Sequence, residues 1–133
     1  MRYLLDTNAV IHLLKTADSA LARRLRQHRP EDVCISAIVT HELYFGAFKS
    51  ARVEANLARL QALLFEVLPF DLEDSIASGE IRAKLRAEGT PIGPYDLLIA
   101  GQALARGLTL VSANVKEFRR VEGLTVEDWT HSG

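Results

Sequence analysis

Three carboxylate residues, Asp6, Glu42 and Asp96, have the types and the setting to do chemistry together. Asp6 ends a short apolar run, Glu42 lies inside an apolar stretch, and Asp96 directly precedes another one. Ionised carboxylates that are crowded at one site repel each other unless a cation neutralises them. Oxygen-only ligands suit hard ions, so we expect Mg²⁺ at such a site, with Mn²⁺ as a substitute.

Each of these carboxylates also has a simpler explanation. Asp6 could cap a helix, Glu42 could stand at a solvated helix edge, and Asp96 lies in the first turn after Pro94, where the helix dipole favours a negative charge. It is their joint placement that favours a site. A zinc site is not expected, because the four histidines lack H-x-H or H-x-x-x-H spacing: His12, His28, His41 and His131.

Apolar runs that alternate with helical patterns predict how these residues are positioned. The expected strands cover residues 2–5, 32–35, 66–68, 109–111 and 124–126, and the expected helices cover 8–15, 18–29, 36–45, 51–64, 73–88 and 94–106. This alternation predicts an α/β fold, a three-layer sandwich with a mainly parallel central sheet. Ligands bind such sheets beyond the carboxyl ends of the strands, where Asp6, Glu42 and the segment 112–114 follow a strand.

Length and composition limit the class of protein. The 133 residues fit one domain, expected to span 1–133, and 48% apolar with 25% charged residues indicates an ordinary globular chain. No apolar stretch approaches the roughly 18 residues of a membrane span, and Asp6 comes too early for a signal peptide, so we expect a cytoplasmic protein. A net charge of −1 argues against a basic DNA-binding module. Cys34 is the only cysteine, which excludes an intramolecular disulfide and suggests a buried thiol.

Four segments carry a more specific pattern. They are Leu5-Asp6-Thr7-Asn8, then Ile35-Ser36 with Glu42-Leu43-Tyr44-Phe45-Gly46-Ala47, then Pro91-Ile92-Gly93-Pro94-Tyr95-Asp96-Leu97-Leu98-Ile99-Ala100, and then Leu110-Val111-Ser112-Ala113-Asn114 with Glu117-Phe118. In this order and spacing they resemble the four motifs of PIN-domain ribonucleases. The ending Glu127-Asp128-Trp129 is similar to the VapC branch, the toxin half of VapBC toxin–antitoxin pairs. The resemblance covers residues 2–129.

The resemblance implies a role for each matching residue. Asp6 and Asp96 match the carboxylates that hold the principal Mg²⁺, and Glu42 completes the acidic set. Asn114 is expected in the catalytic group, although many members have Asp there, which leaves open whether one or two metals bind and whether Glu117 joins. Thr7, Ser112 and Lys116 are expected to contact the substrate.

The implied function is that of a Mg²⁺-dependent endoribonuclease toxin that cuts structured RNA, in particular tRNA, by metal-activated attack of water. The implied partners are a VapB-like antitoxin, the RNA and a second copy of the chain in a homodimer or larger assembly, with no membrane. Basic residues that could bind the RNA strand are Lys15, Lys49, Arg82, Arg86, Lys116 and Arg119. Two alternatives remain: a non-catalytic PIN-like RNA-binding module, and a HAD-like phosphatase, whose D-x-D motif would require Asp where Asn8 stands.

Overall fold

A five-stranded parallel sheet forms the centre of the protein in the computed structural model, which describes residues 2–131. The strands are β1 (Tyr3–Leu5), β2 (Val33–Ser36), β3 (Glu66–Leu68), β4 (Thr109–Val111) and β5 (Val126–Glu127). Their order in the sheet is β3-β2-β1-β4-β5, so β1 pairs with β2 on one side and with β4 on the other. From β1 the chain adds β2 and β3 on one side and then returns to add β4 and β5 on the other. Open α/β sheets bind their ligands at such a topological switch point, which here lies between β1 and β4.

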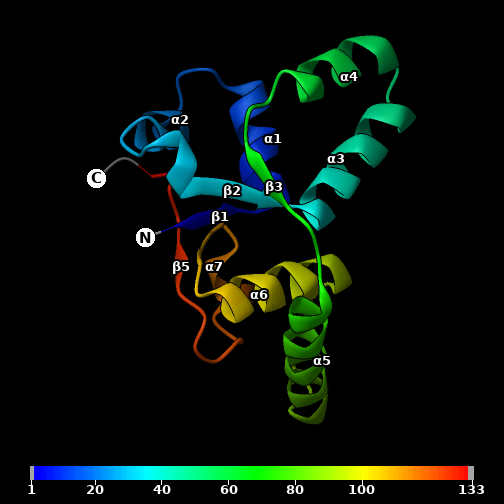
Figure 1. Cartoon of the computed structure of the whole chain (residues 1–133), viewed down its shortest axis with the longest axis vertical. Coiled ribbons are helices and arrows are strands. Elements are labelled where there is room, and N and C mark those ends of the chain that lie inside the picture. Colours follow the sequence, from blue (N-terminus) through cyan, green and yellow to red (C-terminus); the bar gives the residue numbers. More distant parts are fainter. Residues whose placement is uncertain (1, 132–133) are drawn as a thin grey trace.

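The helices cover both faces of the sheet. They are α1 (Thr7–Lys15), α2 (Ala20–Leu25), α3 (Ala37–Lys49), α4 (Val53–Gln61), α5 (Leu72–Ala87), α6 (Pro94–Arg106) and α7 (Val115–Phe118). Figure 1 shows α1 to α4 on one side of the sheet and α5 to α7 on the other. The predicted three-layer α/β sandwich with a parallel sheet is confirmed. Within residues 2–131, no helix has the length and apolar character needed to cross a membrane.

The three central strands are buried on both faces. Leu4, Leu5, Leu110 and Val111 are at most 1% exposed, as expected for a parallel sheet that helices cover on both sides. The Cys34 thiol in β2 is buried, as predicted, and donates a hydrogen bond to the Tyr3 carbonyl at 3.3 Å; burial raises its pKa to about 11. These strands therefore give a rigid base for the loops that follow them.

Helices α5 and α6 approach each other closely because Gly101 faces Ser78. A Cβ atom added at Gly101 would lie 2.6 Å from the Ser78 Cβ and 2.7 Å from its Cα. Only glycine allows the two backbones to come so near. The position of α6, which carries Asp96, thus depends on a residue without a side chain.

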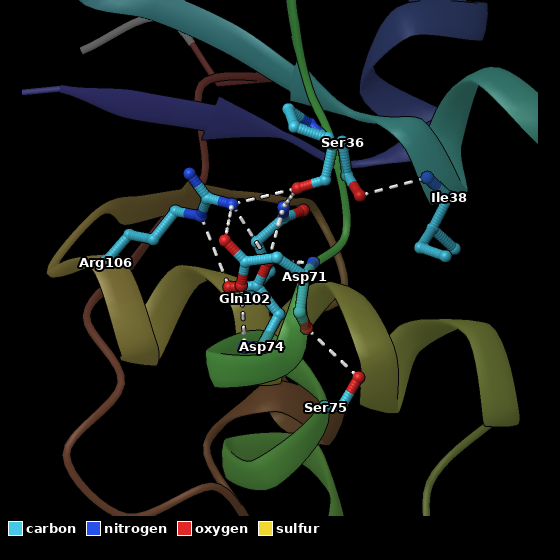
Figure 2. A network of polar contacts seen from close by, with 8 residues as sticks. Ser36, Ile38, Asp71, Asp74, Ser75, Gln102 and Arg106 are labelled. Carbon is cyan, nitrogen blue, oxygen red and sulfur yellow. Dashed lines mark hydrogen bonds and ion pairs between the residues drawn. The ribbon is translucent and has the colours of Figure 1, made fainter.

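A polar network fixes the other end of this helix pair (Figure 2). Arg106 of α6 binds the fully buried Asp74 carboxylate with both Nε and Nη2, at 3.2 and 2.9 Å, and Gln102 donates to the same carboxylate at 3.1 Å. Burial on its own raises the pKa of Asp74, but hydrogen bonds from Arg106 and the Asp71 backbone outweigh it and hold the pKa below its ordinary value. The buried charge is therefore paired and hydrogen-bonded.

Two local predictions were wrong, and one short helix was missed. Helix α2 ends at Leu25 and not near residue 29, because the His28 ring leaves the helix to stack on Trp129 at a centroid distance of 4.9 Å. Leu64, predicted to continue the stripe of α4, lies beyond its end and is 94% exposed. The short helix α7 was not predicted.

Candidate active site

Asp6 follows β1 and begins α1. Its carboxylate accepts a hydrogen bond from the Ala9 backbone N–H at 2.8 Å, and its own N–H donates to the Val111 carbonyl at 3.1 Å. The residue is 3% exposed. Burial raises the pKa of Asp6, hydrogen bonds from Ser112 and Ala9 lower it, and the charge of Glu42 raises it further, with a net increase. Asp6 is thus both a helix cap and a buried acidic group.

Glu42 lies on α3 and points to α1. The Thr7 hydroxyl donates to Glu42 Oε1 at 2.7 Å, and the Glu42 side chain is half-buried. This hydrogen bond ties the Glu42 carboxylate to the start of α1, next to Asp6. Thr7, predicted to contact the substrate, therefore orients Glu42 in this structure.

Asp96 stands in the first turn of α6, behind Pro94. Burial raises the pKa of Asp96 to about 6, and the charges of Glu117, Asp6 and Glu42 contribute in that order. These four carboxylates come from four separate segments of the chain and lie within electrostatic range of one another. The fold gathers the three acidic residues predicted from the sequence and adds a fourth.

Glu117 is the acidic residue that the sequence left undecided. Its carboxylate accepts hydrogen bonds from the Gly93 backbone N–H at 3.0 Å and from the Asn114 side-chain amide at 2.8 Å. These bonds lower the pKa of Glu117, so it remains ionised beside Asp96. Asn114 is exposed, and in this structure its amide holds Glu117. The one sequence signal for Glu117 was its position one turn after Asn114.

The remaining predicted residues lie at two different depths. Ser112 is 1% exposed, and its hydroxyl hydrogen-bonds Asp6 and accepts from the Asn114 backbone N–H at 2.9 Å. Ser112 therefore positions the Asp6 carboxylate and has almost no exposed surface with which to contact a substrate. Lys116 is exposed on α7 and directly precedes Glu117 in the sequence.

The donor chemistry of the acidic group fits a hard divalent cation. All of its side-chain ligand atoms are carboxylate oxygens, and the pKa values of Asp6 and Asp96 are raised by burial and by the neighbouring carboxylates. Within residues 2–131, however, no three His, Cys, Asp or Glu side chains are already arranged as a ligand cage.

Two hollows flank Glu42 on the surface. One has a volume of about 400 Å³ and lies between α1, α3 and α4, with aliphatic and polar side chains in its lining. The other has a volume of about 600 Å³ and is lined by residues that include His41, Phe45 and Tyr95. His41 and Tyr95 were not singled out from the sequence, although they directly precede Glu42 and Asp96.

Comparison with known proteins identifies the family of the chain. The PIN domain family profile matches residues 3–124. The chain belongs to the PIN-domain family. This membership decides against a HAD-like phosphatase.

Relatives of this PIN domain are similar over nearly their whole length. A "tRNA(fMet)-specific endonuclease VapC" from Salmonella typhimurium is 41% identical, with 97% of this chain and 98% of the relative covered. "Ribonuclease VapC2" from Haemophilus influenzae is 38% identical, with the same coverage. The predicted likeness to the VapC branch is confirmed.

Solved structures show the same arrangement of the PIN domain. A DNA-bound VapBC structure from Salmonella typhimurium superposes with a TM-score of 0.92 at 41% identity and covers 97% of this chain and 98% of the solved one. VapBC-1 from Haemophilus influenzae superposes with a TM-score of 0.91 at 36% identity and covers 98% of this chain and all of the other. Both are VapBC structures.

Proposed function

We propose that this PIN domain is a metal-dependent endoribonuclease and the toxin of a toxin–antitoxin pair. The main support is a cluster of four carboxylates beyond the carboxyl ends of β1, β2 and β4: Asp6, Glu42, Asp96 and Glu117. Mg²⁺ is the proposed ion, with Mn²⁺ as a substitute, and Asp6, Asp96 and Glu42 are the proposed ligands. Such an ion supplies Lewis-acid activation of water and neutralises charge on the phosphate.

The residues of the chain have distinct tasks in this proposal. Asp6 is held by Ser112 and by the start of α1, so its position is set before any ion binds. Thr7 orients Glu42 from the other side. Glu117 stays ionised and adds negative charge beside Asp96, which favours binding of a cation.

The proposed reaction is the attack of water on an RNA phosphodiester, which leaves a 5′-phosphate and a 3′-hydroxyl. Because this reaction does not need the 2′-hydroxyl, preference for RNA must come from binding. The names of the Salmonella typhimurium and Shigella flexneri relatives, 41% and 39% identical, make tRNA(fMet) the first substrate to test. The proposed partners are a VapB-type antitoxin and a second copy of the chain.

A cleavage assay tests the activity. The purified chain is incubated with tRNA(fMet) in Mg²⁺, in Mn²⁺ and in EDTA, beside the variants Asp6→Asn and Asp96→Asn. Asn caps helices as well as Asp does, so Asp6→Asn removes the charge and keeps the start of α1. Asp18→Asn is the matched control, because Asp18 is an exposed carboxylate that pairs with Arg26 away from the site.

We expect cutting with Mg²⁺ or Mn²⁺ by the parent and by Asp18→Asn, and none by the two site variants. Cutting that continues in EDTA would contradict the mechanism. RNA binding without cutting under any of these conditions would instead support the non-catalytic binding module. The toxin role is tested by expressing the chain alone and with the adjacent antitoxin gene, and equal growth of the two cultures would refute that role.

A further inference from the structure

The aromatic hollow beside Glu42 carries an inference about how the substrate is held. Helices α1, α3 and α6 line this hollow of about 600 Å³, and its lining includes Thr7, His41, Glu42, Phe45, Lys49 and Tyr95. Thr7 and Glu42 also belong to the acidic site, where they hydrogen-bond each other. The hollow is therefore continuous with the acidic site.

The rings of the hollow are unusually open to solvent. Phe45 is 59% exposed and Tyr95 is 45% exposed. The His41 and Tyr95 rings lie 5.7 Å apart between centroids, tilted by 50°. Large apolar side chains that gather at the surface mark binding sites more often than isolated ones do.

A cationic side chain, Lys49, lies next to these rings. His41, Phe45 and Lys49 follow one another at i, i+4 and i+8 on α3, so they share one face of the helix over about 12 Å. The Lys49 ammonium lies 5.0 Å from the Phe45 ring centroid. Going outward from the acidic site, the surface thus offers Tyr95 with His41, then Phe45, then a positive charge.

We propose that this surface binds the single-stranded nucleotides next to the scissile phosphodiester. Tyr95 and His41 stack on the nearer base, Phe45 stacks on the next one, and Lys49 binds a phosphate. Aromatic platforms with a nearby cation bind unpaired nucleotides in this way, and splayed bases are what RNA-binding proteins commonly recognise. The inference rests on the proposed ribonuclease function and adds the residues that hold its substrate.

The neighbouring hollow supports the choice of RNA over a peptide for this surface. Its lining in residues 2–131 has no aromatic ring and combines aliphatic side chains, among them Leu14 and Leu60, with polar ones such as Lys15, Asn56 and Arg59. Aliphatic surfaces of this kind suit apolar side chains of a protein partner. Of the two hollows, the one on the other side of Glu42 is the one with rings on which a base can stack.

Binding measurements test the proposal in an Asp96→Asn background with Mg²⁺ present, so that RNA stays intact. The probes are tRNA(fMet) and a short single-stranded RNA that contains 2-aminopurine, whose fluorescence falls when the base stacks. We expect Tyr95→Ala and Phe45→Ala each to raise the Kd by about 5- to 150-fold and to lose the quenching. Tyr95→Phe should bind like the parent, whereas Tyr95→Leu, which keeps apolar volume without a ring, should not.

The chain offers a close control. Phe48 is on the same helix as Phe45 and is 62% exposed, but it does not line the hollow. Phe48→Ala should therefore bind RNA like the parent. Circular dichroism of each variant shows whether it folds.

The outcomes separate the two proposals. If the parent cuts RNA, but Tyr95→Ala and Phe45→Ala bind it as tightly as Phe48→Ala, the stacking surface is refuted and the nuclease proposal stands. Weaker binding of the antitoxin with unchanged binding of RNA would refute it as well and assign the rings to the protein partner. A parent that neither cuts nor binds RNA overturns both proposals.

Discussion

Replacing Asp96 with Asn should make the metal-free protein more stable at neutral and alkaline pH. The substitution keeps the shape of the side chain and its place in the first turn of α6, and it removes one negative charge from the acidic site. Burial and the charges of Glu117, Asp6 and Glu42 disfavour the ionised form of Asp96 in the folded chain. In the unfolded chain these effects are absent, so ionisation there costs nothing extra.

The size of the effect follows from the pKa. A rise from 3.8 to about 6 corresponds to at most about 3 kcal/mol at about 1.4 kcal/mol per pKa unit. Because Asp96 is half-exposed, solvent screening reduces this to about 1–2 kcal/mol. Asp96 binds its proton more tightly in the folded than in the unfolded protein. The parent is therefore not destabilised by Asp96 below about pH 4, and its free energy of unfolding falls as the pH rises through about 6. For a chain of this length the variant should melt about 3–8 °C higher at about pH 8 and at nearly the parent's temperature at about pH 4.

The assay is thermal unfolding followed by circular dichroism in EDTA at several pH values, with Asp18→Asn as the control for loss of an exposed carboxylate. The same melts are then repeated with increasing Mg²⁺. The parent should gain stability as the ion binds the folded state, and Asp96→Asn should gain clearly less.

Two results would refute this reasoning. A variant that melts at or below the parent's temperature at about pH 8 would mean that the ionised Asp96 is not disfavoured in the folded protein. Equal stabilisation of parent and variant by Mg²⁺ would mean that Asp96 does not bind the ion.

Two further predictions concern the helix pair α5 and α6, which positions Asp96. Gly101→Ala should destabilise the protein by about 1–3 kcal/mol, because the new methyl group meets the Ser78 backbone. Gly79→Ala on the facing helix is the control: its methyl group enters open space, so the variant should be neutral or stabilised by up to about 1 kcal/mol. Equal effects of the two substitutions in urea unfolding would contradict the close contact at Gly101. Asp74→Asn should cost about 2 kcal/mol at pH 7 because it leaves Arg106 half-paired, and, since the pKa of Asp74 is lowered, the cost should shrink as the pH falls below about 4. A cost that stays constant from pH 7 to 3 would argue against an ionised Asp74.

The topology and the acidic residues were readable from the sequence because both depend on strong local signals. Buried parallel strands are continuous apolar runs, and Asp6 directly follows the first of them. Asp96 was readable because Pro94 begins the helix and a carboxylate before an apolar run stands out. In each case the sequence pattern and the structural feature that it predicts lie within the same few residues.

The remaining features depend on contacts between distant segments. Glu117 joins the site because the Gly93 backbone, 24 residues earlier, donates to its carboxylate. The end of α2 depends on the stacking of His28 on Trp129, about a hundred residues later. The aromatic hollow forms only where α3 meets α6, so spacing along either helix alone could not reveal it.

The place of β1 in the sheet also bears on how the protein is made. This strand is synthesised first, yet it needs β4, more than a hundred residues later, as its second neighbour. The acidic site likewise lacks Asp96 and Glu117 until most of the chain exists, on the order of ten seconds after Asp6 at usual rates of translation. A nascent chain therefore cannot hold the complete acidic site, and the proposed nuclease stays inactive on the ribosome until its last segments have been made.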